Sequence, residues 1–334
     1  MKKGCVVGIG AIGPIHADAL QKENRLYGVC DVKPERLSSF APENTNIKRF
    51  SSFNAVCKDP LVDTVHICTP HYLHKEMTIQ ALKAGKHVVL EKPAAISFDQ
   101  LNELAFAEQN TNKKICIMLQ NRTNPSVCLL HQLLKNPKQE WGKLCGITGF
   151  LTWQRTPQYY QHDDWRGRWE TEGGGVMINQ AVHLFDLICY LGGPVSAITA
   201  TISNKYLHQI EVEDTADAIL EMSSGVHACF YATNTYTTNS PVRLEFEFEN
   251  ILFRYADNRL YQITKDDCQI LIHDDSSTPG RSYWGSGHAR VIHDFYAHLE
   301  GDEIPYLSLS DAMPVMKTLL SFYKSAKEGK RIIL

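Results

Sequence analysis

The 334-residue chain has no excess of basic residues, no long hydrophobic run and no closely spaced pair of cysteines. Its 34 lysines and arginines stand against 37 aspartates and glutamates, for a formal net charge of −3. This balance argues against a nucleic-acid-binding surface and against a polybasic membrane-binding surface. The most apolar stretch, residues 175–192, is interrupted by polar side chains, so no transmembrane helix is expected.

The ten cysteines are scattered singly, and several fall within apolar, strand-like runs. Cysteine used as a small hydrophobic residue is typical of a reduced, intracellular protein. The start of the chain, two lysines followed by a short apolar run, superficially resembles a signal peptide. The run is rich in glycine and continues into a helical pattern without a convincing cleavage site. We therefore predict a first strand here and a cytoplasmic location.

Over the first 120 residues, short apolar runs alternate with helical patterns, which is typical of β-α-β units. The runs are continuous rather than alternating, as expected for parallel strands that are covered on both faces. We predict strands at 5–9, 26–30, 64–68, 87–90 and 115–119, and helices at 14–21, 73–84 and 98–109. The first domain, residues 1–120, is thus predicted to hold a doubly wound parallel sheet.

The second half has a different period. Residues 242–249 alternate strictly between apolar and charged, and residues 216–222 and 226–231 flank a Ser-Ser-Gly turn. We predict that residues 121–334 form an α+β domain with a large, open, mostly antiparallel sheet, ending in a helix at 310–327. An open sheet face is a natural surface for a homodimer or homotetramer, although burial under helices is equally consistent with this pattern.

Residues 8–13 fit the pattern G-x-G-x-x-G between the first predicted strand and the first predicted helix. Glycines in this turn let backbone amides approach a pyrophosphate at the helix N-terminus. Asp31 ends the second predicted strand, where a carboxylate accepts hydrogen bonds from the adenosine ribose. This is the fingerprint of a Rossmann dinucleotide-binding domain. Asp31 favours NAD over NADP, whereas Lys33 and Arg36 soften that preference and leave NADP possible.

Several motifs occur in an order that resembles one family across nearly the whole chain. These are His16 after the glycine motif, Glu-Lys-Pro at 91–93, Trp-Arg-Gly at 165–167, and a triple glycine at 173–175 followed by His183 and Asp186. The chain resembles the glucose-fructose oxidoreductase/inositol dehydrogenase/rhizopine catabolism (Gfo/Idh/MocA) family. The resemblance implies an NAD(P)-dependent dehydrogenase of sugars, cyclitols and related alcohols, with an N-terminal Rossmann domain and a C-terminal open-sheet domain.

The resemblance makes Lys92 the catalytic lysine and His183 the acid/base. An ammonium group beside the reacting C–O bond stabilises alkoxide character as hydride leaves, and a neutral imidazole accepts the hydroxyl proton. Asn179 stands where inositol-type members have an aspartate, which argues against simple cyclitol dehydrogenation. The Asn-Gln pair at 179–180 instead looks like the branch that handles nucleotide-sugar acids and other modified sugars. A helix predicted over residues 176–191 places Asn179, His183 and Asp186 on one face, at i, i+4 and i+7. Asp186 is interpreted mainly as a structural residue.

The glycine motif and the resemblance together predict two sets of binding residues. The cofactor set is Gly8, Gly10, Ala11, Ile12, Gly13, Asp31, Thr69, Pro70, His71, His74, Glu91, Lys92 and Asn121. The substrate set is Lys92, Arg122, Trp165, Arg166, Asn179 and His183, in which Arg122 is predicted to clamp a carboxylate or phosphate of the substrate. No metal site is predicted: His288, His293 and His298 recur every five residues, a spacing that spreads them around a helix.

The function predicted from the sequence is hydride transfer between nicotinamide and a secondary alcohol of a sugar or sugar derivative. Two alternatives share the fold. One is an NAD-dependent glycosidase that oxidises its substrate transiently, and the other is a non-catalytic regulator that senses a nucleotide. A lysine and histidine fit for proton transfer argue against the regulator, but they do not separate the dehydrogenase from the glycosidase.

Overall fold

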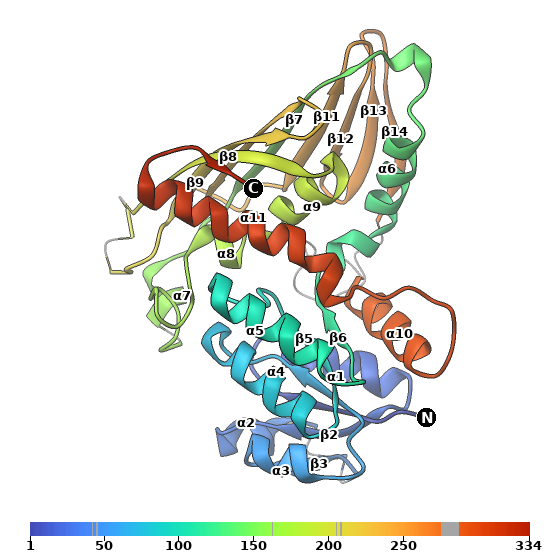
Figure 1. Cartoon of the computed structure of the whole chain (residues 1–334), viewed down its shortest axis with the longest axis vertical. Coiled ribbons are helices and arrows are strands. Elements are labelled where there is room, and N and C mark those ends of the chain that lie inside the picture. Colours follow the sequence, from blue (N-terminus) through green and yellow to red (C-terminus); the bar gives the residue numbers. More distant parts are fainter. Residues whose placement is uncertain (42, 45, 162, 205, 208, 275–286) are drawn as a thin grey trace. The chain divides into compact units, whose positions relative to one another are not determined.

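The computed structural model describes residues 1–334 except 42, 45, 162, 205, 208 and 275–286 (Figure 1). The chain divides into two compact units. The first comprises residues 1–119 and 288–313, and the second comprises residues 120–287 and 314–334. The predicted boundary at residue 120 lies at this division, but residues 288–313 return to the first unit. Among the described residues, no helix combines the length and apolar character needed to span a bilayer.

The first unit holds a six-stranded, fully parallel sheet in the order β3-β2-β1-β4-β5-β6. This order confirms the predicted doubly wound sheet. The strands are β1 (Gly4–Val7), β2 (Leu26–Cys30), β3 (Lys48–Phe50), β4 (Thr64–Ile67), β5 (His87–Leu90) and β6 (Ile115–Ile117).

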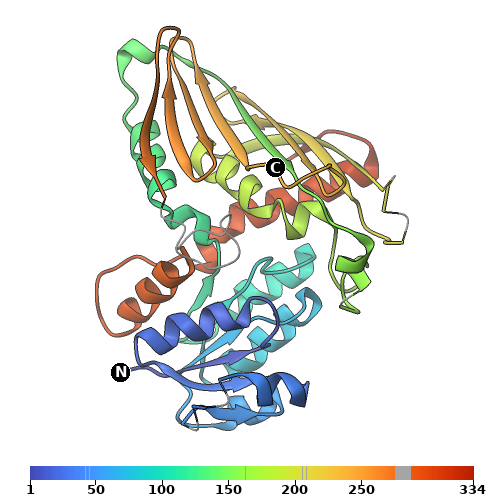
Figure 2. The ribbon, with the colours of Figure 1, turned by 180° about the vertical axis from the view of Figure 1, so that it is seen from behind.

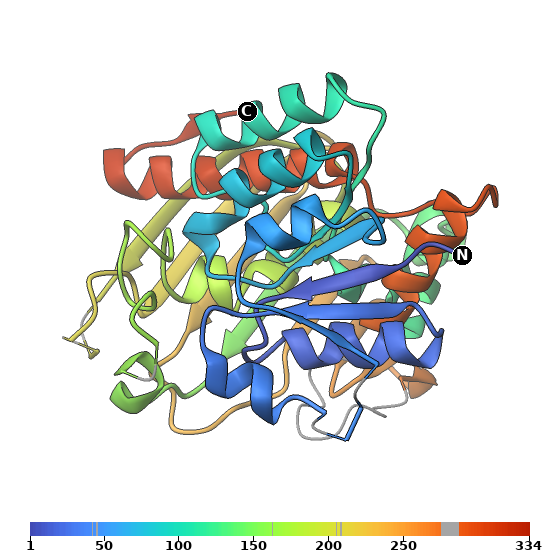
Figure 3. The ribbon, with the colours of Figure 1, turned by 90° about the horizontal axis from the view of Figure 1, so that it is seen from below.

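Helices cover both faces of this sheet, with α1 on one face and α4 and α5 on the other (Figure 3). Helix α10 joins the α1 face, where its Ile292 and Phe295 share one buried apolar cluster with Leu20 of α1. The helices of the unit are α1 (Gly13–Lys22), α2 (Pro34–Ser39), α3 (Phe53–Lys58), a 3₁₀ turn (His71–Leu73), α4 (His74–Lys83), α5 (Phe98–Gln109) and α10 (Gly287–Leu299).

The second unit is built on a nine-stranded sheet in the order β14-β13-β12-β11-β7-β10-β9-β8-β15. All neighbours pair antiparallel except β7 and β10, so the predicted, mostly antiparallel sheet is confirmed. The strands are β7 (Leu144–Thr152), β8 (Val195–Ser203), β9 (Thr215–Met222), β10 (His227–Thr233), β11 (Arg243–Phe248), β12 (Leu252–Ala256), β13 (Arg259–Ile263), β14 (Cys268–His273) and β15 (Ile332–Ile333).

One face of this sheet carries helices and the other is open: Figure 1 shows α9 and α11 in front of the strands, and Figure 2 shows the strands uncovered from behind. The alternation predicted for β11 is present, since Leu244 and Phe246 are buried and Arg243 is exposed. A homodimer or homotetramer through the open face stays a prediction. The helices are a 3₁₀ turn (Gln120–Thr123), α6 (Pro125–Lys135), a 3₁₀ turn (Gln139–Trp141), α7 (Pro157–Gln161), α8 (Val176–Asn179), α9 (Val182–Gly192) and α11 (Leu309–Glu328), whose first turn belongs to the first unit.

Candidate active site

The glycine motif forms the turn between β1 and α1, and its geometry requires glycine. Gly8 has a φ of +92°, and a Cβ placed there would lie 2.6 Å from the carbonyl oxygen of Cys68. A Cβ on Gly13 would collide with the carbonyl oxygen of Gly8. Helix α1 begins at Gly13, so the turn leads directly to a helix N-terminus. These residues fit the pyrophosphate of a dinucleotide, and Gly10, Ala11 and Ile12 complete the turn.

Asp31 follows β2, and two backbone amides orient its carboxylate. Oδ2 accepts a hydrogen bond from Ile9 N at 2.8 Å, and Oδ1 accepts one from Lys33 N at 2.9 Å. A carboxylate oxygen can accept more than one hydrogen bond, so this orientation is compatible with ribose hydroxyls as further donors. The guanidinium of Arg36 lies 3.5 Å from Oδ2. The positive charge of Arg36, which was expected to soften the preference for NAD, is therefore paired with Asp31.

The loop after β4 is tied to the loop after β5 by His74. Its Nδ1 lies 2.7 Å from the carbonyl oxygen of Pro93, and its Nε2 lies 2.9 Å from that of Thr69. The imidazole is fully buried, which lowers its pKa. His74 thus joins the two loops, a role that its sequence position did not reveal. Cofactor contacts by Thr69, Pro70, His71 and His74 stay predictions.

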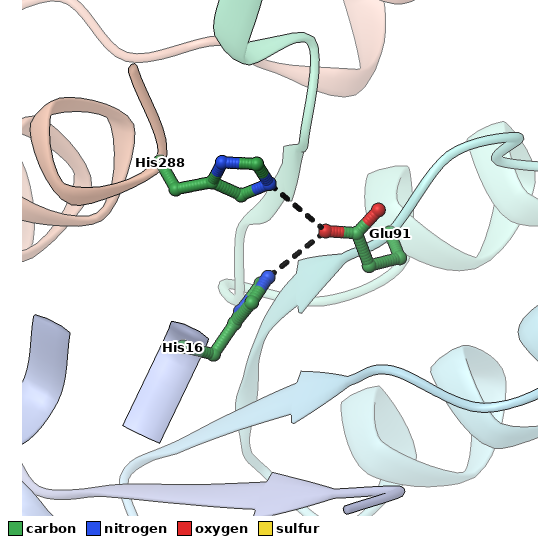
Figure 4. Close-up of side chains that lie close together, drawn as sticks. All are labelled: His16, Glu91 and His288. Atoms are coloured by element: carbon green, nitrogen blue, oxygen red, sulfur yellow. Dashed lines mark hydrogen bonds and ion pairs between the residues drawn. The ribbon is translucent and has the colours of Figure 1, made fainter. Parts of the chain in front are cut away.

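Glu91 and Lys92 follow β5, and the carboxylate of Glu91 is directed into the unit. Oε1 lies 2.9 Å from Nε2 of His16 and 3.8 Å from Nε2 of His288 (Figure 4). Oε2 accepts a hydrogen bond from the backbone N–H of Lys92 at 3.3 Å. Burial by itself would raise the pKa of Glu91, but the hydrogen bond from His16 and the neighbouring charges lower it to about 2. The peptide bond between Lys92 and Pro93 is cis.

His16, Glu91 and His288 were not grouped by sequence reasoning, because they come from α1, the end of β5 and α10. Among the described residues they are the group of His, Cys, Asp or Glu side chains close enough to hold a metal ion. The three histidines of α10 do diverge as their spacing predicts. His288 faces Glu91, His293 pairs with Glu23, and His298 contacts the carbonyl oxygen of Ile304.

In the second unit, His183 lies in the first turn of α9 and is half-buried. Its Nε2 lies 3.3 Å from Nε2 of Gln120. With this orientation of the amide, Nε2 of His183 accepts from the NH₂ group; with the amide turned over, Nε2–H donates to Oε1 of Gln120. In either arrangement the neutral imidazole has one unprotonated nitrogen, the kind of group that accepts a proton from a hydroxyl. Gln120 was not among the predicted site residues.

The single helix predicted over residues 176–191 is two helices, α8 and α9, separated at residues 180–181. Asn179, His183 and Asp186 have different partners within the unit. Asp186 is fully buried and receives hydrogen bonds from Nε and Nη2 of Arg122. This pairing agrees with the structural role predicted for Asp186, which stays a prediction. The binding of a substrate anion by Arg122, and of the cofactor by Asn121, stay predictions.

Glu172 organises the polar residues around Asn179. It accepts hydrogen bonds from Nδ2 of Asn179 at 2.5 Å and from the backbone N–H of Gly167 at 2.6 Å. Nη1 of Arg166 lies 3.9 Å from the same carboxylate and donates to the hydroxyl of Tyr159 at 2.7 Å. The sequence showed a neutral amide at position 179 but not the carboxylate seven residues earlier that orients it.

The guanidinium of Arg166 also stacks on aromatic rings, 4.4 Å from the centre of Trp165 and 4.7 Å from that of Tyr159. The hydroxyl of Tyr159 in turn accepts a hydrogen bond from Nε2 of Gln180 at 3.0 Å. The guanidinium plane of Arg166 and the half-exposed indole of Trp165 both present flat surfaces of the kind that pack against sugar rings. Sugar binding by Trp165 and Arg166 stays a prediction, and Tyr159 was missed.

Helix α8 is fastened to α11 through the buried Glu213. Oε1 accepts hydrogen bonds from the hydroxyl of Tyr323 at 2.9 Å and from Met177 N at 3.1 Å. Burial raises the pKa of Glu213 to about 7, although these hydrogen bonds lower it. Between pH 4.5 and 7 the folded protein therefore keeps a proton that the unfolded chain has lost, so this group's contribution to stability falls as pH rises.

We expect Glu213→Gln to remove this pH dependence. The free energy of unfolding of the wild type, relative to the variant, should fall by up to about 3 kcal/mol between pH 5 and pH 8. Urea unfolding at both pH values measures the difference, with the exposed Glu170→Gln as the matched control. An equal difference between wild type and variant at the two pH values would contradict the prediction.

Residues 2–119 match the model of an oxidoreductase family with an NAD-binding Rossmann fold, and residues 130–251 match the GFO/IDH/MocA C-terminal domain. The parallel sheet, its glycine turn and the second, open-sheet unit define the class as a two-part nicotinamide-dependent oxidoreductase fold. The chain belongs to the Gfo/Idh/MocA oxidoreductase family. Both the resemblance and the NAD cofactor predicted from the sequence are confirmed at the level of the family, whereas use of NADP stays a prediction.

Known proteins resemble the chain over its whole length. The chain is 24% identical to glucose-6-phosphate 3-dehydrogenase of Bacillus subtilis, with 97% of this chain and 96% of that protein covered. It is 22% identical to D-glucoside 3-dehydrogenase of Escherichia coli, with 98% and 96% covered. The crystal structure of the WlbA dehydrogenase from Bordetella pertussis, in complex with NADH and UDP-GlcNAcA, is similar with a TM-score of 0.86 at 28% identity, covering 100% of this chain and 98% of that one. Other curated relatives are matched over only 62% to 65% of their own length.

Proposed function

We propose that the protein is an NAD-dependent dehydrogenase that oxidises a secondary ring hydroxyl of a nucleotide-linked sugar acid. The observation that carries the proposal is the convergence at one edge of the parallel sheet. There β1 ends in the glycine turn, β2 ends at Asp31, and β5 ends at Glu91 and Lys92. The carboxyl ends of the strands in such a sheet are where ligands bind. A cofactor turn and an ammonium group thus share one edge.

The chemistry follows from two side chains. The ammonium group of Lys92 donates a hydrogen bond to the substrate oxygen and stabilises the negative charge that develops there. His183, when neutral, accepts the hydroxyl proton, with the substrate hydroxyl taking the place of Gln120 as its hydrogen-bond partner, and returns the proton in the reverse direction. When bound, NAD supplies the hydride acceptor. The turn at residues 8–13 holds its pyrophosphate and Asp31 holds its adenosine ribose.

Two comparisons support the substrate class. The WlbA dehydrogenase, whose structure contains UDP-GlcNAcA, is similar to this chain over its full length. The Asn179–Gln180 pair resembles that of the branch handling nucleotide-sugar acids and other modified sugars, and both amides are held by hydrogen bonds, to Glu172 and Tyr159. Two full-length relatives are named as 3-dehydrogenases, which favours the hydroxyl at position 3 of the ring.

The proposal is tested by a substrate panel with the purified protein. NAD or NADP is supplied in turn with UDP-linked sugar acids, UDP-sugars, sugar phosphates, free sugars, cyclitols and aryl glycosides. Reduced-nicotinamide absorbance and released aglycone are followed together. We expect net NAD reduction with a UDP-linked sugar acid at a kcat/KM at least about tenfold above that with any free sugar. A free sugar lacks polar groups of the UDP-linked substrate, so it loses at least one hydrogen bond to the protein.

Each other outcome has a definite meaning. Net reduction with another member of the panel would keep the dehydrogenase and replace the substrate class. Aglycone release without net reduction would move the protein to the NAD-dependent glycosidases. Tight NADH binding without turnover of any compound would favour the nucleotide-sensing regulator. Position-specific deuterium labelling of the accepted substrate at C3 reports the site of oxidation, since only loss of that label transfers deuterium to NAD.

A further inference from the structure

A chain of buried polar side chains runs through the interior of the first unit to the carboxylate of Glu91. The hydroxyl of Tyr296 in α10 lies 3.1 Å from Nε2 of His66 in β4. Nδ1 of His66 lies 3.0 Å from Nδ1 of His16 in α1, and Nε2 of His16 lies 2.9 Å from Oε1 of Glu91. Tyr296, His66 and His16 are each 0% exposed, and Glu91 is 6% exposed. We call these four residues the Glu91 chain.

The donors and acceptors of the Glu91 chain can be ordered from its carboxylate end. An ionised carboxylate only accepts, so Nε2 of His16 must carry a proton. If His16 is neutral, its Nδ1 accepts from His66, whose Nε2 then accepts from the hydroxyl of Tyr296. If His16 is a cation, its Nδ1 donates to His66, whose Nε2 then donates to Tyr296. In both states every contact is satisfied, and His16 donates to Glu91.

The distances favour hydrogen bonding over a shared metal ion. Two ligands of a tetrahedral zinc ion, each about 2.0–2.1 Å from the metal, lie about 3.3 Å apart. His16 Nε2 and Glu91 Oε1 are 2.9 Å apart, a usual hydrogen-bond length, and His288 Nε2 is 3.8 Å from the same oxygen. Burial also lowers the pKa of His288 to about 4, so it is neutral at pH 7 and forms no ion pair.

We propose that the Glu91 chain holds Glu91 as a fixed, ionised carboxylate behind Lys92, and that Glu91 is thereby a positioning residue for the ammonium group of that lysine. The second carboxylate oxygen accepts a hydrogen bond from the backbone N–H of Lys92, so the negative charge lies next to the backbone of this lysine. The inference rests on the proposed function, in which Lys92 acts on the substrate oxygen.

Four further titratable groups among the described residues surround Glu91. They come from each neighbouring element: His16 from α1, Cys68 after β4, His74 from α4 and His288 from α10. Burial raises the pKa of the Cys68 thiol and lowers the pKa of His288, so these two are neutral near pH 7. Both ring nitrogens of His74 face carbonyl oxygens, of Pro93 and of Thr69, and not the carboxylate. His16 donates to the carboxylate in either charge state.

The test is the pH dependence of kcat/KM for the oxidation supported by the substrate panel. In the proposed reaction the acidic limb reports His183, which must be neutral, and the alkaline limb reports Lys92, which must be protonated. Glu91→Gln keeps the shape and removes the charge, but it keeps only one of the two accepted hydrogen bonds, because its NH₂ group can only donate. We expect its alkaline limb to move down by about one pH unit or more, because a nearby opposite charge shifts a pKa by that amount. The acidic limb should not move.

Three further variants separate charge from position. Glu91→Asp keeps the charge but shortens the reach to His16, so kcat should fall while the alkaline limb stays in place. Tyr296→Phe removes only the far hydroxyl of the Glu91 chain and should lower kcat about threefold, the effect of one hydrogen bond, at unchanged KM. Glu108→Gln, whose carboxylate accepts from Ile115 N elsewhere in the unit, is the matched control and should behave as wild type.

The possible failures are distinguishable. If Lys92→Ala retains the wild-type rate, the proposed function is wrong. If Lys92→Ala is inactive but Glu91→Gln keeps the wild-type alkaline limb, the positioning role is wrong. If Glu91→Gln does not fold, Tyr296→Phe decides, and a wild-type kcat in that variant overturns the proposal. Stoichiometric Zn²⁺ binding by calorimetry that His288→Ala abolishes would replace the hydrogen-bonded chain with a metal site.

Discussion

Replacing Lys92 with alanine is expected to lower the rate of hydride transfer by about a thousandfold while the protein still binds NADH. The magnitude is that of removing one preorganised donor aimed at a developing oxyanion. The cofactor turn at residues 8–13 and Asp31 follow β1 and β2, whereas Lys92 follows β5, so the pyrophosphate and adenosine-ribose contacts are expected to remain in the variant. Stopped-flow NADH absorbance measures the rate, and NADH fluorescence titration measures the dissociation constant.

Two variants make the Lys92 experiment specific. Lys83→Ala removes an exposed lysine at the end of α4 and should leave both quantities unchanged. Lys92→Arg keeps the positive charge with a different shape, and a partial rate, between those of alanine and wild type, is expected. A rate within about tenfold of wild type for Lys92→Ala would show that the oxyanion is stabilised elsewhere, since loss of one such donor costs more.

The architecture of the first unit was largely predictable because its signals are local. β2, β5 and α5 occupy the predicted residues, 26–30, 87–90 and 98–109. The three-residue β3 and the six-residue α2 and α3 were not predicted, because such short elements contain fewer than two full periods of the strand or helix pattern. The glycine turn was also predictable, because it is a short motif of six consecutive residues in which the backbone geometry requires glycine at Gly8 and Gly13.

The return of α10 to the first unit was not predictable from order along the chain. Its buried face, including Val291, Ile292 and Phe295, packs with α1 residues more than 270 positions earlier. An amphipathic pattern shows that a helix has a buried face, but not which surface it covers. The same reason explains why His16 and His288 could not be linked to Glu91, although each is present in the sequence as a separate histidine.

The site residues of the second unit were also predicted only in part. Asn179 and His183 were identified by their motif, whereas their partners Glu172 and Gln120 were not. A helical face predicted over residues 176–191 would have placed Asn179, His183 and Asp186 together, yet each is held by a different residue. The break between α8 and α9 leaves no signal in hydrophobic periodicity, because the residues on both sides of it are buried.

Asp186→Asn is expected to lower the free energy of unfolding by about 3–5 kcal/mol, the largest stability effect we predict, because it leaves a buried guanidinium without its counter-charge. Arg122 and Asp186 are both buried, and the pair is held by contacts from Nε and Nη2. Urea unfolding measures the loss. Asp18→Asn breaks an exposed pair with Lys22 and should cost no more than about 0.5 kcal/mol.

The double variant Arg122→Met with Asp186→Leu separates the structural role of the pair from the predicted substrate clamp. Replacing a buried ion pair by apolar side chains of similar volume is often neutral or stabilising, so the double variant should recover most of the stability that Asp186→Asn loses. If Arg122 serves only Asp186, the double variant should also keep the wild-type KM. If Arg122 in addition binds a carboxylate or phosphate of the substrate, KM should rise by about tenfold or more while stability is restored, because a charge-assisted hydrogen bond to the substrate is lost. If the double variant does not recover the lost stability, loss of charge compensation between Arg122 and Asp186 is not the reason that Asp186→Asn is destabilised.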